Sequence, residues 1–403
     1  MSEKQNPSEV NDYISNAALN KEPIFKAYKR LCSIYGEMDY VDYEWRYYQF
    51  LHGNCDISIE KSPENSSSVS FTDLPIDVLK KVMGKLDMIN CLVVRKVSHD
   101  LRNMVDDSKL KCKDVILFFD RDKCELHLDN WVVTYDSTNG QNVGLSKKAS
   151  RDSSYIEHVK WRKFNYPVNV FERMIDDATT ILKNSKLEID YFEVQTKDRE
   201  VPLQLVTFLE SLNFQIHAKE LNLSLESNTN PLIPILKSIT PKTLKKIRFV
   251  YGLEMDKMNE IMEMEQWKKA EIFDWKYIPY GFPIEKLFRF KQFSVEELLY
   301  LSEELLINIR DTLLKLPHFE SCILAVLVSE PEYDEDEDEV GIQFDFIDGI
   351  MSQDPAYNSE THRYLIPNSR EYFEFDIYLP FGRRYYIESR LECLEIKRTS
   401  LDN

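Results

Sequence analysis

Apolar residues recur at helical spacing near the start of the chain. They lie three or four residues apart, at Ile24, Ala27, Tyr28, Leu31 and Tyr35. An aromatic-rich run from Tyr40 to Phe50 follows. Such spacing is typical of short helices that bury one face. We expect a small helical domain over residues 21–60, with a disordered lead-in over 1–20 and a polar linker over 61–68.

A second helical segment is expected after this linker. It starts with Phe71-Thr-Asp-Leu-Pro75, in which Thr72 or Asp73 can cap a helix and Pro75 suits the first turn. The apolar side chains that follow fall on one face, at Val78, Leu79, Val82, Met83 and Leu86. A second helix over 88–101 carries a further apolar face. A segment of about 40 residues cannot fully cover such faces, so another surface should bury them.

From Val115 onward the apolar pattern changes to short runs typical of strands. Three runs come first, at 115–119, 124–128 and 131–135, and six more recur at 187–192, 220–225, 246–250, 270–275, 290–295 and 321–328. Helical stretches over 201–212 and 294–316 lie between some of them, and residues 371–380 and 384–398 resemble closing strands. Repeated strand–helix units predict an irregular leucine-rich-repeat-like α/β solenoid within an α+β multidomain chain. An ordinary α/β domain with alternating elements is the alternative.

Composition and charge argue against several classes of protein. Lys and Arg number 51 against 69 Asp and Glu, and this net charge of −18 repels nucleic acid unless a local basic patch overrides it. Only 10 of 403 residues are glycine, and the sequence contains no P-loop, GxGxxG, HExxH or GxSxG motif. Nucleotide-dependent enzymes and hydrolases are therefore disfavoured, and we assign no catalytic residue and no cofactor.

Cysteine and histidine positions give no metal site. The seven cysteines are scattered without a CxxC pair, which is typical of reduced thiols, and His127 beside Cys124 is weak evidence for a metal without a second pair. The acidic block 332–339 lacks the spacing of a calcium loop and predicts an exposed loop. No apolar stretch is long enough to span a bilayer, so we expect a soluble cytoplasmic or nuclear protein without membrane contact.

The segment 69–110 resembles an F-box. The resemblance lies in the order of Phe71-Thr-Asp-Leu-Pro, Val78-Leu79, Leu86 and Leu92-Val-Val-Arg-Lys-Val-Ser-His-Asp-Leu-Arg102. It implies binding to a Skp-like adaptor and, through it, to a cullin. The expected adaptor-binding side chains are Leu74, Pro75, Val78, Val82, Met83, Leu86, Leu92 and Val97. The competing interpretation is that these side chains pack against the following domain.

Two further segments resemble known domains. Residues 111–403, with VILFFDRDKCELHLDNW, AKELNLSL and YYIESRLECLEIKR, are similar to the FTH domain of the nematode-type F-box A family. The family implies a non-catalytic substrate receptor of a Skp–cullin–F-box ubiquitin ligase, whose FTH region captures an unidentified target protein. Residues 24–60 are similar to the helix-turn-helix of mariner-type transposases, but residues 21–60 hold five basic and seven acidic side chains, which argues against DNA binding. A protein-interaction scaffold without ligase function, or a DNA-associated factor, remains the alternative.

Overall fold

The computed structural model divides into two compact units, Met1–Ser70 and Phe71–Asn403. The structure describes residues 7–20, 22, 24–36, 38–51, 76–138, 142–148, 156–163, 170–197, 200–226, 228–279, 281–298, 301–329, 344–378 and 389–400. Each unit has a hydrophobic core of its own. The chain therefore folds around at least two separate cores.

The described residues of the first unit form three helices, α1 (Pro7–Leu19), α2 (Ile24–Tyr35) and α3 (Tyr40–Leu51). Their core combines small aliphatic residues of α1 with aromatic residues of α3, including the buried Tyr43 and Tyr47. The Tyr47 hydroxyl donates to the Glu22 carbonyl at 2.7 Å, and the Tyr28 hydroxyl donates to the Met38 carbonyl at 2.7 Å. These bonds join the aromatic side chains to the loops between the helices.

The prediction of a disordered lead-in is wrong for residues 7–19. Val10, Ile14, Ala17 and Ala18 of α1 are buried, and their spacing of four, three and one residues forms one helical face. Alanine contributes little to a hydrophobic pattern, although it has the highest helix propensity. The face is therefore easy to overlook among the polar residues around it.

The second unit begins with three short helices, α4 (Ile76–Met83), α5 (Met88–Val94) and α6 (His99–Asp107). The single helix expected over 88–101 is wrong, because the chain leaves the helix after Val94 and a new helix starts after Ser98. The Ser98 hydroxyl caps α6 by accepting from the Leu101 amide at 3.2 Å. The Asp87 carboxylate caps α5 by accepting from the Asn90 amide at 2.8 Å.

A sheet of 15 strands follows these helices, with further helices between its strands. Its order is β12-β13-β14-β15-β11-β10-β9-β8-β7-β6-β1-β2-β3-β4-β5. The middle strands pair in parallel, and they are β1 (Lys111–Phe119), β6 (Glu188–Thr196), β7 (His217–Ser224), β8 (Lys246–Phe249), β9 (Ile272–Tyr277), β10 (Gln292–Leu298) and β11 (Ser321–Ser329).

Antiparallel strands extend both sides of this parallel centre. Beyond β1 lie β2 (Lys123–Leu128), β3 (Trp131–Asp136), β4 (Asn142–Lys148) and β5 (Ile156–Lys163). Beyond β11 lie β15 (Ser389–Ser400), β14 (Glu371–Tyr378), β13 (Arg363–Leu365) and β12 (Tyr357–Asn358). The unit is thus a mixed α/β structure built on one large sheet.

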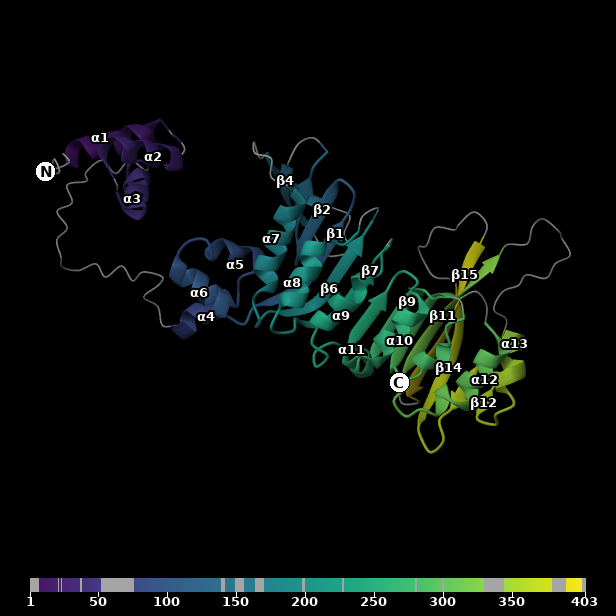
Figure 1. Ribbon diagram of the computed structural model, residues 1–403. Coiled ribbons are helices and arrows are strands. Elements are labelled where there is room, and N and C mark those ends of the chain that lie inside the picture. The colour runs from purple at the N-terminus through teal and green to yellow at the C-terminus, as the bar shows by residue number, and fades with distance from the viewer. Residues whose placement is uncertain are drawn as a thin grey trace. The chain divides into compact units, whose positions relative to one another are not determined.

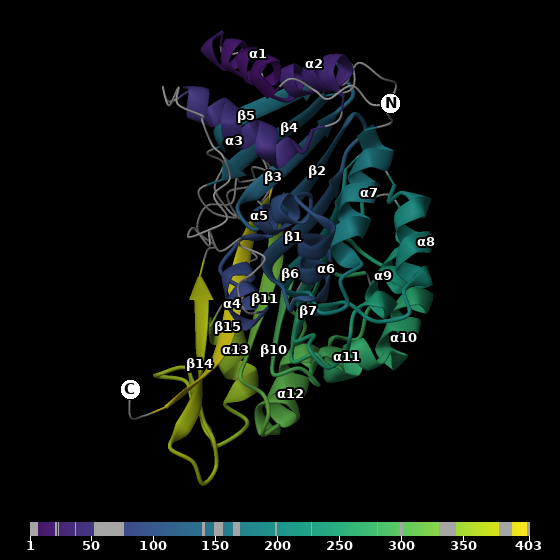
Figure 2. The same cartoon turned by 90° about the vertical axis from the view of Figure 1, so that its left-hand side faces the viewer.

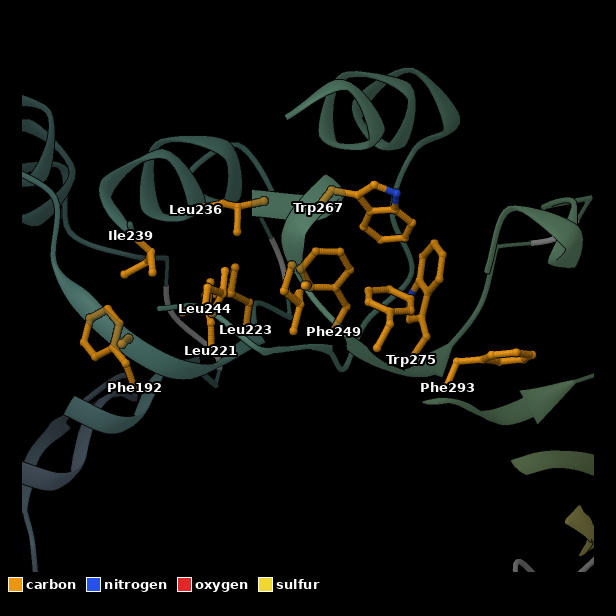
Figure 3. Packing of buried hydrophobic residues seen from close by; sticks show 14 of the residues in the cluster. Phe192, Leu221, Leu223, Leu236, Ile239, Leu244, Phe249, Trp267, Trp275 and Phe293 are labelled. Atoms are coloured by element: carbon orange, nitrogen blue, oxygen red, sulfur yellow. The ribbon is translucent and has the colours of Figure 1, made fainter. Parts of the chain in front are cut away.

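Helices line one face of the parallel strands (Figures 1 and 2). They are α7 (Val170–Leu182), α8 (Leu203–Ser211), α9 (Leu232–Ser238), α10 (Met255–Glu263), α11 (Glu265–Lys269) and α12 (Glu303–Asp311). Short 3₁₀ turns η2 (Ile284–Leu287) and η3 (Leu313–Lys315) and the helix α13 (Phe344–Met351) complete the helical elements of the described residues. Figure 3 shows the core between strands and helices, with Phe192, Leu221, Leu223, Phe249 and Trp275 of the strands below Leu236 and Trp267 of the helices.

The strand runs predicted from the sequence overlap observed strands, and several of them extend past a strand end. The helical stretch expected over 294–316 is wrong at its start, since residues 294–298 belong to β10 and α12 starts only after Ser302. The Ser302 hydroxyl accepts from the Leu305 amide at 3.2 Å and sets that boundary. The leucine-rich-repeat-like character of the strand–helix units stays a prediction, and the acidic block 332–339 lies outside the described residues.

Candidate functional site

The three-helix segment α4–α6 buries part of its apolar surface within this chain. Met83, Cys91, Leu101 and Val105 belong to the same buried cluster as the strand residues of β1. Met83 has only 1% of its surface exposed. Its assignment as an adaptor contact is therefore wrong, because the body of this chain already covers it.

Other predicted adaptor contacts remain accessible. Val78 is 42% exposed and Val97 is 69% exposed, while Val82, Leu86 and Leu92 are half-buried. Leu74 and Pro75 lie outside the described residues. The competing interpretation, that these side chains pack against the following domain, therefore holds for part of the apolar surface. The sheet covers one part, and exposed valines, including Val93 at 56%, form another.

Two aspartates attach these helices to the sheet. The Asp129 carboxylate, in the turn between β2 and β3, accepts from the Lys113 amide at 2.7 Å and from the Met88 amide at 3.5 Å. Asp87, the cap of α5, accepts from the Trp131 indole N–H at 3.3 Å. Asp129 has a positive φ of 54°, which aspartate tolerates better than most residues. Asp129 and Asp87 therefore each accept one hydrogen bond from the helical segment and one from the sheet.

Further contacts join α6 to the start of β6. The Asn184 side-chain amide donates to the Ser108 carbonyl at 3.2 Å, and the Lys186 ammonium binds both the carbonyl and the carboxylate of Asp107. Cys112 lies beside Asp129, and its buried thiol has a pKa raised by burial and by that carboxylate. The helical segment and the sheet thus share a core and a polar seam.

The face of the sheet opposite α7–α12 is the second candidate surface, and we call it the open face. Along each central strand, residues alternate between the core and this face. The open face carries Asp114, Ile116 and Phe118 of β1, Tyr191, Glu193 and Gln195 of β6, Glu220, Asn222 and Ser224 of β7, Lys246 and Arg248 of β8, Asp274 of β9 and Ser294 of β10. Most of them are polar, in contrast to the core side chains of Figure 3.

Neighbouring strands bring one polar residue each into a single row across the open face. This polar row consists of Glu193, Asn222, Arg248, Asp274 and Ser294, which are consecutive partners in the strand register. Parallel pairing aligns such partners on one face of a sheet. Residues 20 to 29 positions apart in the sequence therefore lie on neighbouring strands.

Hydrogen bonds connect the members of the polar row at the β6–β7 end. The Asn222 amide donates to the Glu193 carboxylate and to the Tyr191 hydroxyl, both at 2.8 Å. The Tyr191 hydroxyl also donates to Glu193 at 3.0 Å. The carboxylate is thereby held by two neutral groups of known position.

Ion pairs organise the other end of the row. The Lys246 ammonium lies 2.7 Å from the Asp274 carboxylate, which also accepts from the Ser294 hydroxyl at 2.8 Å. The Arg248 guanidinium lies 2.9 Å from the Glu296 carboxylate. Charges of both signs therefore alternate along this part of the open face.

Two buried polar atoms in the middle of the row have no hydrogen-bond partner, the Asn222 Oδ1 and the Arg248 Nε. Asn222 and Arg248 are direct partners in the register of β7 and β8. An unmatched buried acceptor or donor costs about 1–3 kcal/mol. Two such atoms therefore lie on directly paired residues of the polar row.

A hollow of about 320 Å³ lies on the open face over β1, β2 and β6. Its lining combines the apolar Ile116 and Phe118 with the polar side chains Glu125, His127, Lys148, Tyr191, Glu193 and Gln195. The Glu125 carboxylate accepts from His127 at 2.8 Å and lies 2.6 Å from the Lys123 ammonium. Burial raises the pKa of Glu125, but hydrogen bonds from His127 and Lys123 outweigh it and lower the pKa to about 2. The hollow therefore contains a carboxylate that is ionised at neutral pH.

The polar row and the hollow were not predicted from the sequence. His127 had been considered only as a weak metal ligand with Cys124, but Cys124 lies in the core while His127 binds Glu125 on the open face. Among the described residues, no group of three or more His, Cys, Asp or Glu side chains could hold a metal ion. The available signal was the alternation of polar and apolar residues in strands such as Glu220 to Leu225.

No helix in the described part of the chain is long and apolar enough to cross a membrane.

Comparison with known domains classifies both parts of the second unit. An F-box domain matches residues 71–113, and an FTH domain matches residues 201–345. These matches support the F-box/FTH family, as the sequence resemblance predicted. An F-box suggests a substrate-recognition role in a ubiquitin ligase, through a Skp-like adaptor, and F-box proteins are typically non-catalytic receptors.

The F-box A protein 224 of Caenorhabditis elegans is a relative of this chain. The two are 24% identical over 327 residues, which cover 78% of this chain and 82% of the relative. The crystal structure of EvdMO1 is similar over 44% of this chain and 37% of its own, with 12% identity and a TM-score of 0.20, a likeness too weak to inform the fold. The similarity of residues 24–60 to a mariner-type helix-turn-helix stays a prediction.

Proposed function

We propose that this chain is the substrate-recognition subunit of a Skp–cullin–F-box ubiquitin ligase. The F-box would bind the Skp-like adaptor and thereby the cullin, and the sheet with its irregular, leucine-rich-repeat-like units would bind a target protein. One observation carries the proposal, namely that the F-box and the sheet share a core and are joined by Asp87 and Asp129. A target on the sheet would thus keep a constant position relative to the adaptor, which favours transfer of ubiquitin by proximity.

The exposed apolar side chains of the F-box favour adaptor binding. Val78 and Val97 would lose water on docking, and the half-buried Val82, Leu86 and Leu92 would complete the contact. Burial of apolar surface contributes about 25 cal/mol per Å², and a stable interface covers about 800 Å² on each partner. Leu74 and Pro75 remain proposed contacts on the sequence resemblance alone.

Co-purification with a Skp-like adaptor tests this proposal. Val78→Asp and Val97→Asp should each abolish adaptor binding, because a charge would enter an apolar contact without disturbing the core. Leu203→Asp is the matched control, since Leu203 is an equally apolar, 74% exposed side chain on α8 outside the F-box. The proposal fails if the wild-type chain does not bind the adaptor, or if both valine variants bind it as tightly as the control.

For the first unit we propose a protein-binding or structural role rather than DNA binding. Its helices expose apolar side chains, among them Leu19 at 70% and Ile34 at 57%. Residues 21–60 carry more acidic than basic side chains, which leaves little counterion release to support DNA affinity. A gel shift with duplex DNA at low salt should therefore show no complex, and a salt-sensitive complex would instead support the DNA-associated alternative.

A further inference from the structure

We propose that the outer edge of β5 binds an extended, acidic segment of the target protein, which adds to the sheet as a further strand. This inference rests on the proposed function and specifies the chemistry of its target. Backbone groups of β5 pair with those of the segment, and basic residues of β4 and β5 attract its carboxylates. Recognition of this kind takes its affinity from main-chain hydrogen bonds and its specificity from side chains.

The position of β5 in the sheet is the first argument. It is the last strand of the sheet order and pairs with β4 on one side, as Figure 2 shows. No described strand pairs with its other side. The backbone groups on that side form an edge to which another strand can add.

The length of this edge distinguishes it from the opposite edge of the sheet. Among the described strands, the opposite edge is β12, which has two residues, whereas β5 has eight. Very short edge strands are one way in which proteins prevent unwanted pairing. Because each further aligned residue adds main-chain hydrogen bonds, β5 is the edge that can hold a peptide strand.

The charge of the last two strands is the second argument. Together they contain five basic residues and one acidic residue, namely Lys147, Lys148, Lys160, Arg162 and Lys163 against Glu157. The chain as a whole has 51 basic and 69 acidic residues, so this excess of positive charge is local. It favours an acidic ligand. It also repels β5 of a second copy, because lysines on an edge strand oppose pairing between identical edges.

Contacts of β4 place this edge next to the F-box. The Lys147 ammonium lies 5.3 Å from the centre of the Trp131 ring, and the Trp131 indole donates to Asp87 of α5. Lys147 is also the register partner of Glu157 on β5. A segment bound along β5 therefore keeps a defined position relative to the F-box.

A peptide fits this edge better than two other acidic ligands. Nucleic acid also has negative charge, but a sugar–phosphate backbone does not form the ladder of a β-sheet, and the net charge of −18 repels it. Residues 332–339 of this chain contain seven acidic residues in eight, and aspartate and glutamate are depleted in strands. An acidic segment that also contains strand-forming residues is therefore the favoured occupant.

Fluorescence anisotropy with the full-length chain tests the inference. The probe is a labelled eight-residue peptide in which glutamate and threonine alternate, because threonine favours strands and alternation puts all carboxylates on one face. This peptide should bind, and the same peptide with lysine in place of glutamate should not. The inference is overturned if the glutamate peptide does not bind.

Backbone methylation separates strand addition from charge attraction alone. One peptide carries N-methyl groups on its glutamates and another carries them on its threonines, so each has only one edge of the peptide strand blocked. One of the two should bind about tenfold less tightly than the other, because it loses hydrogen bonds to β5. Equal affinities would overturn the inference. An oligothymidylate of the same charge should bind less tightly than the glutamate peptide, and tighter binding would make nucleic acid the ligand instead.

Protein variants locate the site. Lys160→Glu combined with Arg162→Glu should weaken peptide binding at least about tenfold. Lys242→Glu combined with Lys286→Glu makes the same change of charge at exposed positions elsewhere in the second unit and should leave the affinity within about twofold. Glu157→Gln guards against a misfolded variant, because it should tighten binding several-fold. Equal losses in the two double variants, or an unchanged affinity in Glu157→Gln, would overturn the inference.

Two further measurements exclude occupants from this chain itself. Replacing residues 332–339 with glycine and serine should leave the peptide affinity unchanged, and tighter binding would identify that block as the occupant. Light scattering should show no dimer that the peptide dissociates, since such a dimer would identify a second copy as the occupant. Either of these opposite results would overturn the inference.

Adaptor co-purification is scored separately from peptide binding. If the adaptor binds and the acidic peptide does not, only this inference fails. If the acidic peptide binds along β5 of a chain that does not bind the adaptor, the ligase proposal fails and the edge remains a peptide-binding site.

Discussion

The two faces of the central strands perform different tasks with residues that alternate in the sequence. On the helix side, Phe249 and Trp275 contribute rings to a closely packed aromatic cluster. On the open face, the neighbouring Arg248 and Asp274 form ion pairs and hydrogen bonds with groups on adjacent strands. Apolar packing is non-directional and supports stability, whereas directional polar groups can distinguish ligands. The period of two in a β-strand therefore separates the apolar core from a polar face that could recognise a target in the proposed function.

The largest expected effect on the free energy of unfolding comes from a substitution in the apolar core on the helix side. Trp275→Ala should lower the free energy of unfolding by about 3–5 kcal/mol, because it removes ring contacts with Phe249, Phe273 and Phe282 and leaves a cavity. Denaturant titration followed by circular dichroism measures the change. Lys276→Ala, one residue further along β9, is the matched control and should change the free energy by no more than about 0.5 kcal/mol. Comparable losses in both variants would contradict the division between the two faces.

The next largest effect is a pH dependence of the free energy of unfolding, caused by Glu125 on the open face. The pKa of Glu125 in the folded chain is about 2, below its ordinary value of 4.5. A carboxyl with a lowered folded pKa adds stability that is present above its unfolded pKa and is lost as the pH falls through the folded pKa. This contribution is about 3 kcal/mol and should disappear between about pH 4.5 and pH 2.

Glu125→Gln tests this contribution. The variant should lose less stability than the wild type as the pH falls across this interval, because it has no carboxylate to protonate there. Chemical denaturation at closely spaced pH values measures the difference. If the free energy of unfolding of Glu125→Gln and of the wild type changed with pH in parallel, the ionised Glu125 carboxylate would not stabilise the fold.

The sequence predicted the strands better than the site. Runs such as 220–225 are recognisable as strands because polar and apolar residues alternate within a few positions. The break in the F-box at Ser98 was missed, because neither glycine nor proline stands there and a serine cap looks like any other polar residue. The polar row was missed for a different reason. It depends on the register between strands that are distant in the sequence, and local patterns do not contain that information.

A smaller effect concerns the seam between the F-box and the sheet. Asp129→Ala should cost about 2–3 kcal/mol, because it removes the acceptor for two backbone amides and places alanine at a positive φ. Asp129→Asn should cost less, since asparagine tolerates this backbone and keeps one side-chain oxygen. Amide hydrogen exchange should show faster opening of α5 in the alanine variant. Asp120→Ala, in the turn at the other end of β1, should leave the amide exchange of α5 unchanged. Faster exchange of α5 in this variant would argue against a specific role for Asp129.

The smallest effect on stability is expected at the centre of the polar row. Asn222→Leu removes the hydrogen bonds to Glu193 and Tyr191 but also removes the unmatched Oδ1, so the two changes should largely cancel and alter the free energy of unfolding by less than about 1 kcal/mol. Leu223→Asn, the adjacent residue on the helix side, should cost several times more, because it places an amide in the apolar core without partners. Denaturant titration of both variants compares the faces directly. If Asn222→Leu proved as destabilising as Leu223→Asn, the polar row would be part of the structural core rather than a surface available for recognition.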